Sequence, residues 1–303
     1  MARSHVNSGQ KLNLFGRSQW PKVEVPLDFI SPEPRPLTIT ESTNLGGFFT
    51  ASTGLALRLA TGAFVLGWKV ETLFSPEDGT YALQLGPFRI RDSSSVLEQA
   101  TRPEEVIVLY DNESSPRCKR VREMMNLLDI TYECRPCFGP YMYNLLPCIV
   151  DPNVDKTILG DENIIEYLLE QYEPPTSSYD PKALWPITFE EFSLATSQMA
   201  IMIRGSIGMV QQSTARPDNA SMKPLELWAY ECSPFVRPVK EKLSTLGLPH
   251  TIVSCSRGSK NRDRMVDKVG RFQVPYLVDA NTGVEMFEGA EIVKYLEAVY
   301  THH

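Results

Sequence analysis

The chain has 303 residues, of which 42% are hydrophobic and 22% charged, so its composition excludes a disordered or fibrous protein. Its 30 Lys and Arg residues against 37 Asp and Glu give a net charge of −7, which provides no electrostatic footprint for nucleic acid or for an anionic membrane surface. Six cysteines are too few for a secreted disulfide framework in a chain of this length. We therefore expect reduced, reactive or buried thiols in a reducing compartment.

The N-terminal segment is basic and rich in proline. Its first 23 residues contain Arg3, Lys11, Arg17 and Lys22 but no acid, a composition similar to the end of an organelle transit peptide, with a solvated terminus as the alternative. Five prolines between residues 21 and 37 predict an extended lead, because proline and the residue before it disfavour regular elements.

An apolar stretch from Phe48 to Val70 raises the question of a membrane span. Arg58 lies at its centre, and an ionised guanidinium at mid-bilayer costs about 2.5 kcal/mol or more on insertion scales. We therefore expect a helix from about Leu45 to Phe64 that is buried in protein rather than in a membrane.

The next segment predicts a mixed α/β unit. A β-branched run is followed by a polar turn with a proline, a helix with apolar residues on one face, two further strands and a closing helix. The predicted elements are the strands Val106–Tyr110, Ile130–Glu133 and Cys148–Asp151 and the helices Cys118–Leu128 and Asn163–Tyr172. Their order is β-α-β-β-α.

The same order returns downstream as an internal repeat. The sequence ECSPFVRPVKE at Glu231–Glu241 overlays ESSPRCKRVRE at Glu113–Glu123 with an offset of 118 residues. Farther on, Val274–Asp279 overlays Leu146–Asp151 with an offset of 128 residues. The first copy therefore lacks ten residues before its proline, where the second has a helical pattern at Asn261–Val269.

The repeat extends backwards to a preceding helix. A helix expected from about Phe189 to Gln212 carries Arg204 and Gly208 in R-x-x-x-G spacing, which matches Arg58 and Gly62 ahead of the first copy. We expect two similar units, each preceded by a helix that contains Arg58 or Arg204, rather than a single continuous sheet. The predicted divisions are an extended lead (1–40), a helix and connecting segment (41–104), a degenerate first unit (105–173), a linker and helix (174–224) and a second unit (225–303).

These residues resemble a known family. A strand, S-P-x-C or S-P-F-V at the head of a helix, V-P before a strand, and E-x-x-x-I-x-x-Y-L in the last helix are similar to the glutaredoxin-like, thioredoxin-fold N-terminal domain of glutathione S-transferases. The resemblance covers Leu225–Tyr300 and Glu105–Tyr172. It implies an α/β fold with two thioredoxin-like (βαββα) domains in tandem and no all-helical transferase C-terminal domain. Similar tandem proteins of plants and algae imply the chloroplast as the location, with the cytoplasm as the alternative.

The resemblance also implies glutathione as a co-substrate. Ser233 occupies the position from which family serines hydrogen-bond the glutathione thiolate, and Cys232 directly precedes it. The positive end of a helix macrodipole stabilises a thiolate, which suits sulfur chemistry whatever the family. In the first copy the equivalent position is Ser115, and Cys118 is the second position of a degenerate C-x-x-C. The candidate catalytic residues are Ser233, Cys232 and Cys118.

The family holds glutathione in a cradle built around a cis-proline. Pro275 and, in the first copy, Pro147 match that proline, and we expect a cis peptide at Val274–Pro275. The predicted glutathione-binding set is Ser233, Val274, Pro275, Glu288 and Gly289.

The grip on the γ-glutamyl carboxylate departs from the family pattern. A Glu/Gln-Ser pair at the start of the last helix normally binds this group, but the second copy reads Glu288-Gly289 and loses the hydroxyl. In the first copy Asp161 places a negative charge where the carboxylate should dock. We therefore expect the first copy to lack a full glutathione cradle.

The thiols differ in their predicted reactivity. Cys118 lies at a helix N-terminus among three cations, so we expect a lowered pKa and the fastest reaction, with a half-buried structural thiol as the alternative; the cations are Arg117, Lys119 and Arg120. Cys148 follows a proline on a core strand and should resist modification. Cys232 is either a packing residue or a reactive thiol. The C-x-x-C of Cys134 and Cys137 ends a strand, which favours a structural role over a redox or metal pair.

Two classes of function compete. The first is an enzyme or enzyme-like protein that binds glutathione at the second copy for conjugation, thiol transfer or deglutathionylation, and the intact S-P-F-V and V-P motifs favour it. The second is a non-catalytic thioredoxin-fold scaffold or interaction subunit, associated with a protein partner or a plastid membrane complex, which the eroded Glu-Ser pair favours. The sequence slightly favours the first class. It predicts no metal site.

Overall fold

The computed structural model describes residues 23–34, 45–73, 83–85, 88–216 and 222–302. The basic segment that resembles the end of a transit peptide lies outside the described residues, as does part of the proline-rich lead. The described part of that lead contains a turn but no helix or strand.

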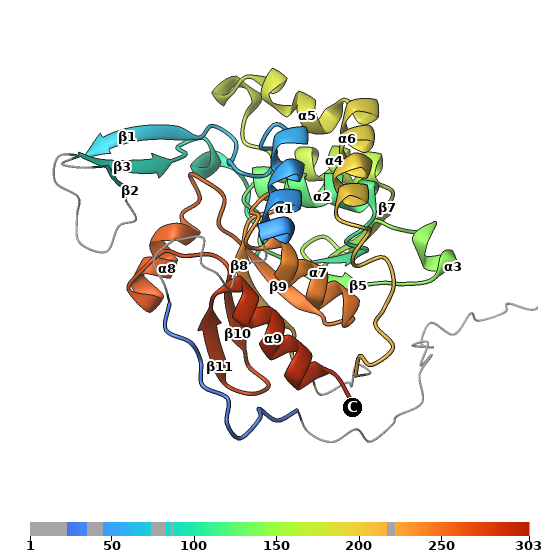
Figure 1. The fold of residues 1–303 in the computed structure, drawn as a ribbon. Helices are drawn as coiled ribbons and strands as arrows, with labels where there is room; N and C mark the ends of the chain where they lie inside the picture. The colour runs from blue at the N-terminus through green and yellow to red at the C-terminus, as the bar shows by residue number, and fades with distance from the viewer. Residues whose placement is uncertain (1–22, 35–44, 74–82, 86–87, 217–221, 303) are drawn as a thin grey trace, which may run out of the picture.

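Two α/β units make up most of the described chain (Figure 1). The first consists of β4 (Ile107–Asp111), α2 (Pro116–Leu127), β5 (Tyr132–Pro136), the short α3 (Pro140–Tyr143), β6 (Cys148–Asp151), β7 (Lys156–Leu159) and α4 (Asp161–Tyr172). The second consists of β8 (Leu225–Ala229), α7 (Arg237–Thr245), β9 (His250–Ser254), α8 (Asn261–Val269), β10 (Tyr276–Asp279), β11 (Val284–Phe287) and α9 (Gly289–Tyr300). The predicted α/β class and both thioredoxin-like units are confirmed.

Each unit has one strand more than the predicted β-α-β-β-α order. The additional strands, β7 and β11, are four residues long and pair antiparallel with β6 and β10 through tight turns. In β7 Lys156, Thr157 and Leu159 are exposed, so the strand lacks the apolar alternation that would mark it in the sequence.

The two units share one sheet of eight strands in the order β11-β10-β8-β9-β5-β4-β6-β7. They join where β5 pairs antiparallel with β9, with Cys134 opposite His250 and Tyr132 opposite Ile252. The expectation of two similar units is therefore right, but the expectation that they would not form a continuous sheet is wrong. Because an edge pair depends only on two exposed backbones meeting, the sequence carries little signal for it.

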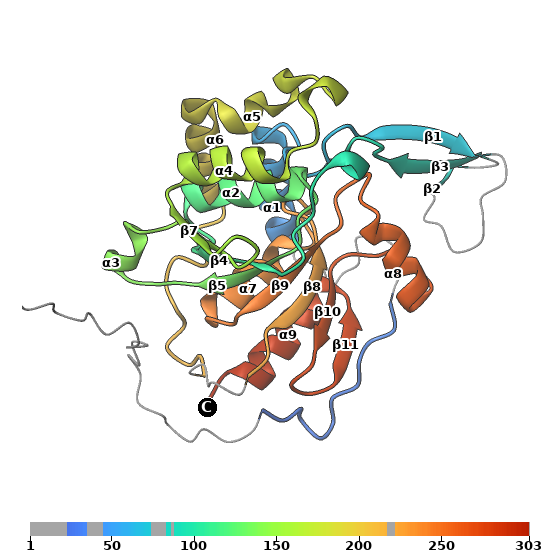
Figure 2. The same ribbon diagram turned by 180° about the vertical axis from the view of Figure 1, so that it is seen from behind.

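The buried core lies between this sheet and the helices of each unit. Ile107 and Leu109 of β4 and Leu225 and Leu227 of β8 are fully buried, as is Val121 of α2. Figure 1 shows α1, α2 and α7 in front of the sheet, and Figure 2 shows the strands from behind. Alternate burial along β4 reflects the period of two that an extended chain imposes.

Both units contain the same buried carboxylate with two tyrosines. In the first, Tyr167 donates to Asp151 at 2.8 Å and Tyr172 donates to the same oxygen. In the second, Tyr295 and Tyr300 each donate to Asp279 at 2.6 Å. All six residues are related by the offset of 128, so the duplication extends to individual hydrogen bonds.

Two helices precede the units and pack against each other, α1 (Leu45–Leu57) and α6 (Glu190–Ile203). Both end earlier than predicted, so Arg58 and Arg204 lie just beyond the helices rather than inside them. Each helix ends because residues after the arginine have positive φ, namely Leu59 and Ala60 in the first case. Gly205 and Ser206 do the same after α6.

The remaining elements connect the units. A three-stranded antiparallel sheet, in the order β1-β3-β2, projects from the body (Figures 1 and 2). Its strands are β1 (Lys69–Leu73), β2 (Leu83–Leu85) and β3 (Phe88–Ser93), followed by the 3-10 turn Leu97–Gln99. The linker between units holds the turns Thr176–Ser178 and Pro181–Leu184 and the short α5 (Trp185–Thr188).

The apolar stretch from Phe48 to Val70 is divided among α1, a turn and the start of β1. Ala51 is buried while Phe49 is 66% exposed, so α1 has one face against protein and one outside. No helix in the described ranges has the length and apolarity needed to cross a membrane.

Candidate functional site

The predicted site is built at the N-termini of α2 and α7, where each unit presents its S-P motif. Ser115 caps α2, since its hydroxyl accepts a hydrogen bond from the Cys118 amide at 3.3 Å. In the second unit α7 begins three residues later, at Arg237, so the equivalent Ser233 does not cap it. Its Oγ is buried and has no hydrogen-bond partner among the residues that the structure describes.

Both serine turns are closed to solvent. Ser115 is 3% exposed and Ser233 is 1% exposed. The turn after α6 covers the first unit, because the Ser114 hydroxyl donates to the Ile207 carbonyl at 2.8 Å. The turn after α1 covers the second unit, where a Cβ on Gly62 would lie 3.1 Å from the Glu231 Cβ.

The candidate thiols are buried too. Cys118 has no exposed surface and Cys232 is 8% exposed. Burial raises the pKa of Cys118 well above its ordinary value and raises that of Cys232 to about 12. The expected lowering of the Cys118 pKa is therefore wrong, because desolvation outweighs the Ser115 hydrogen bond and the Arg122 charge that would lower it.

The cations around Cys118 do not serve the thiol. Arg117 and Arg120 pair with Asp161 at 2.7 and 2.8 Å, and Lys119 pairs with Glu231 at 3.3 Å. Each cation next to the thiol in sequence is thus directed at a carboxylate. Adjacency in sequence therefore did not predict electrostatic support.

The other cysteines divide between core and rim, and all six are free thiols. Cys134 is buried and donates from Sγ to Asp111 at 3.4 Å, whereas Cys137 donates to the Arg135 carbonyl. Cys148 is half-buried rather than fully in the core, because burial alternates along β6 and Cys148 lies on its less buried face. Burial raises the pKa of Cys137 to about 11.

A buried ionic cluster that the sequence analysis did not single out joins the two serine turns. Its symmetric centre consists of Glu113 and Glu231, which begin the two S-P motifs, with Arg122 and Lys240 from α2 and α7. Arg122 lies 3.4 Å from Glu113 and 3.1 Å from Glu231, and Lys240 also pairs with both carboxylates. The pKa of Glu231 is held far below its usual value by these cations, although burial alone would raise it.

A second pair of ion pairs ties α1 and α6 to the units. Arg58 pairs with Glu123 of α2, and Arg204 pairs with Glu241 of α7. The partner threonines are exchanged: Arg58 donates to Thr196 of α6 and Arg204 donates to Thr50 of α1, both at 2.8 Å. The offset of 146 residues between the arginines also separates the threonines, which supports the predicted duplication of helix and unit together.

The cis-proline positions are as predicted. The peptides Leu146–Pro147 and Val274–Pro275 are both cis. Pro275 is buried and Val274 half-buried beside the serine turn of the second unit.

The start of α9 is closed by packing. A Cβ on Gly289 would lie 2.6 Å from the Phe235 carbonyl oxygen and 3.4 Å from Pro275, so the serine turn, the cis-proline loop and α9 meet at this glycine. Glu288, with φ of 70°, accepts a hydrogen bond from Gln273 at 2.9 Å. Gly289 stands where the family has a serine, so the serine hydroxyl is missing. The same glycine, because it has no side chain, allows the Phe235 carbonyl to approach closely.

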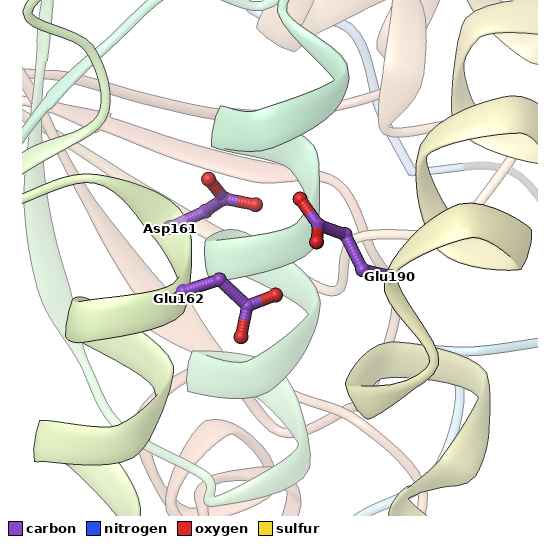
Figure 3. A group of neighbouring side chains, drawn as sticks. All are labelled: Asp161, Glu162 and Glu190. Carbon is purple, nitrogen blue, oxygen red and sulfur yellow. The ribbon is translucent and has the colours of Figure 1, made fainter.

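The start of α4 in the first unit is closed by charge instead (Figure 3). Carboxylate oxygens of Asp161, Glu162 and Glu190 lie within 4.8 Å of one another, a grouping that could hold a metal ion. Arg117 and Arg120 already pair with these acids, with two contacts to buried Asp161, and so compensate most of their charge. Arg117 and Arg120 are therefore already paired with Asp161, and they are not available to bind the carboxylate of a ligand.

The fold of each unit is of the thioredoxin-like class, as the strand order, the cis-prolines and the S-P turns indicate. Residues 109–176 and 227–302 match the family described as glutathione S-transferase, N-terminal domain, so both thioredoxin-like units are similar to that domain. The match leaves the two preceding helices and the projecting sheet outside it. No curated protein and no solved structure matches the chain.

Proposed function

We propose that this protein is a non-catalytic scaffold built from two glutathione S-transferase-like units. In this proposal the S-P turns at Ser115 and Ser233 have a structural role and bind no substrate. The observation that carries this proposal is that Ser115 and Ser233 are both buried, while the turns that follow α6 and α1 pack against the neighbouring residues Ser114 and Glu231. A nucleophile or thiolate-binding hydroxyl must reach its substrate, and neither does so in this conformation.

Exposed apolar side chains support an interaction role. They lie on α1 and α6 and in the turns that follow these helices, and comprise Phe49, Leu59, Met199, Met202, Ile203, Ile207 and Val210. Large exposed apolar patches on folded proteins mark interaction surfaces. A location in the chloroplast remains a proposal from the resemblance and the basic N-terminal segment, and imaging of a fluorescent fusion with and without residues 1–40 tests it.

Isothermal titration with glutathione tests the proposal. We expect no saturable heat at millimolar glutathione and no conjugation of 1-chloro-2,4-dinitrobenzene above the uncatalysed rate. Ser233→Ala should behave like the wild type in both assays. Saturable binding that Ser233→Ala abolishes and Ser115→Ala leaves intact would overturn the scaffold proposal.

That second result would instead establish the other candidate, glutathione binding at the second unit for conjugation or thiol transfer. One observation favours it: the buried Ser233 Oγ has no partner among the described residues, as expected of a hydroxyl whose partner is a ligand. Val274 and Gly289 beside it are half-buried. The first unit offers no equivalent, since Ser115 is engaged as a cap and Asp161 holds both arginines. This candidate therefore requires one site per chain rather than two.

A further inference from the structure

A cavity of about 490 Å³ lies between the turn that follows α1 and the linker that precedes α6. Its wall is largely apolar and includes Leu59, Phe64, Leu66, Trp68, Tyr179 and Ile187. None of its lining residues belongs to the predicted glutathione cradle. The cavity therefore is a feature separate from the serine turns, and it accounts for the second half of the apolar stretch that the sequence analysis singled out.

Two aromatic rings form a fixed part of the wall. The rings of Phe64 and Trp68 lie 4.6 Å apart between centroids and are tilted by 56°. The Trp68 indole N–H donates to Asp92 at 3.0 Å, which holds the larger ring in place. Trp68 nevertheless remains 37% exposed. A large apolar side chain that is oriented by a hydrogen bond but left open to solvent is suited to meet a ligand.

The turn after α6 provides an internal control for these side chains. It has the same backbone contacts: the Leu66 amide donates to Leu127 and the Gln212 amide to Thr245, both at 2.8 Å. Ala60 and Ser206, 146 residues apart, make corresponding bonds to Leu55 and Ile201. At the places of Phe64, Leu66 and Trp68, however, the second turn has Val210, Gln212 and Thr214. The turn after α6 therefore forms without these aromatic side chains. The backbone of the turn does not require Phe64 and Trp68 in the first copy.

The polar side chains that line the cavity are already satisfied by protein. Thr61 donates to the Arg58 carbonyl, Lys69 to Ser95 at 2.9 Å, and Ser178 to the Pro175 carbonyl. Asp180 accepts from the Lys182 amide at 3.0 Å. Lys69 and Asp180 carry opposite charges. A charged ligand would find no complementary excess of charge, so the wall favours a neutral, apolar molecule.

We propose that this cavity binds a neutral, mainly apolar small molecule that packs against Phe64 and Trp68. Its volume is within the range of roughly 300–1,000 Å³ that is typical of sites for drug-sized ligands. Both walls connect to the same ion pair, because Arg58 donates to the Pro186 carbonyl at 3.0 Å and pairs with Glu123. A ligand that touches both walls therefore stabilises the packing of the linker on the first unit.

Fluorescence titration with N-phenyl-1-naphthylamine, a neutral apolar probe, tests this site on the full chain. Ala183 lines the cavity and is exposed, so Ala183→Trp fills the space without disturbing the core. Phe64→Ala removes one ring of the Phe64–Trp68 pair. Val210→Ala is the matched control, since Val210 is the equivalent of Phe64 in the other turn and is 70% exposed.

We expect saturable binding of one probe per chain, weakened about tenfold or more by Ala183→Trp and by Phe64→Ala and changed less than about twofold by Val210→Ala. Circular dichroism and thermal melting verify that each variant folds, and Ala183→Trp decides the result if Phe64→Ala does not. Absence of saturable binding would overturn the proposal. So would equal binding by wild type and Ala183→Trp, or selective loss in Val210→Ala, either of which places the probe outside this cavity.

Discussion

The two units reach the same closed state by different chemistry. In the first, Asp161 begins the last helix and is held by Arg117 and Arg120. In the second, Gly289 begins that helix and lets the Phe235 carbonyl approach. One closure uses ion pairs and the other uses backbone packing, although the fold position is the same. The difference indicates that no single substitution closes the two sites. Both are closed by the shared architecture, in which the turn after α1 covers the second unit and the turn after α6 covers the first.

The largest expected difference between the units lies in the central ionic cluster. Among the residues that the structure describes, Glu231 pairs with Lys119, Arg122 and Lys240, whereas Glu113 pairs with Arg122 and Lys240 alone. Removing one partner of a buried ion pair costs about 3–5 kcal/mol, because the opposite charge is left buried and uncompensated. We expect Glu231→Ala to lower the free energy of unfolding by about that amount, measured by urea denaturation, and Glu113→Ala to lower it less. An equal or reversed order would show that the two halves of the cluster are not distinguished by their number of partners.

The next largest expected effect is a difference in the response to acid between two equivalent residues. They lie on β5 and β9, where the two units join in the sheet. His250 matches Tyr132 at the offset of 118, and both are buried. Burial lowers the pKa of His250 to about 4, with Lys240 and Arg122 lowering it further and Glu113 opposing them. Because the folded state binds this proton less readily than the unfolded state, stability is full above pH 6.5 and falls as the pH drops toward 4.

The expected loss is about 3 kcal/mol between pH 7 and pH 4. Asp129 acts in the opposite direction, since burial raises its pKa to about 6. The test is therefore a difference: the urea midpoint of the wild type should fall more steeply with acid than that of His250→Phe. Parallel pH profiles for the two proteins would contradict the assignment to His250.

Restoring the family serine tests the packed closure of the second unit. Gly289→Ser should destabilise the protein by about 1–3 kcal/mol, because its Cβ must displace the Phe235 carbonyl. Gly289→Ala, which adds the Cβ without the hydroxyl, should cost about the same in thermal denaturation. We expect neither variant to bind glutathione in the calorimeter. A stable Gly289→Ser protein that binds glutathione would mean that this contact yields to a ligand.

The smallest effect is a difference in labelling rates. Cys137 and Cys148 in the first unit are half-buried, whereas Cys232 and Cys255 in the second are buried. With limiting iodoacetamide at neutral pH, peptide mass mapping should find Cys137 and Cys148 labelled before Cys118, the reverse of the order expected from the sequence. Preferential labelling of Cys118 or Cys232 would show that the turns over the S-P motifs open readily.

The sequence predicted the duplication well because the repeated residues have repeated contacts. The overlay at offset 118 aligned Glu113 with Glu231, and these two carboxylates meet in the folded protein. The R-x-x-x-G match, weak as a pattern, corresponds to two arginines with equivalent ion pairs. Periodicity likewise indicated most helices and strands, since one face of each is buried.

Burial of the site could not be predicted in the same way. The dipole argument for Cys118 used only neighbours in sequence, whereas the Ile207 turn that covers Ser114 is more than ninety residues away. Burial depends on such distant contacts, and here it decides the pKa of the thiol. The residues of the buried ionic cluster all lie within the aligned S-P segments. Charged residues are usually solvated, however, so the alignment gave no sign that these side chains would be buried.

The joined sheet also determines which backbone edges remain open. In a separate unit the edge of β5 or β9 would expose unpaired amides and carbonyls, which could pair with a strand of another molecule. In this protein β5 and β9 pair with each other instead. Of the outer strands, β11 receives a hydrogen bond from Ser31 of the lead at its Glu285 carbonyl, and β7 is short and carries Lys156. A proteolytic cut in the linker followed by separation of the halves would uncover β5 and β9 together. Such halves would then be prone to strand-to-strand aggregation, so the covalent link between the units also protects the protein against self-association.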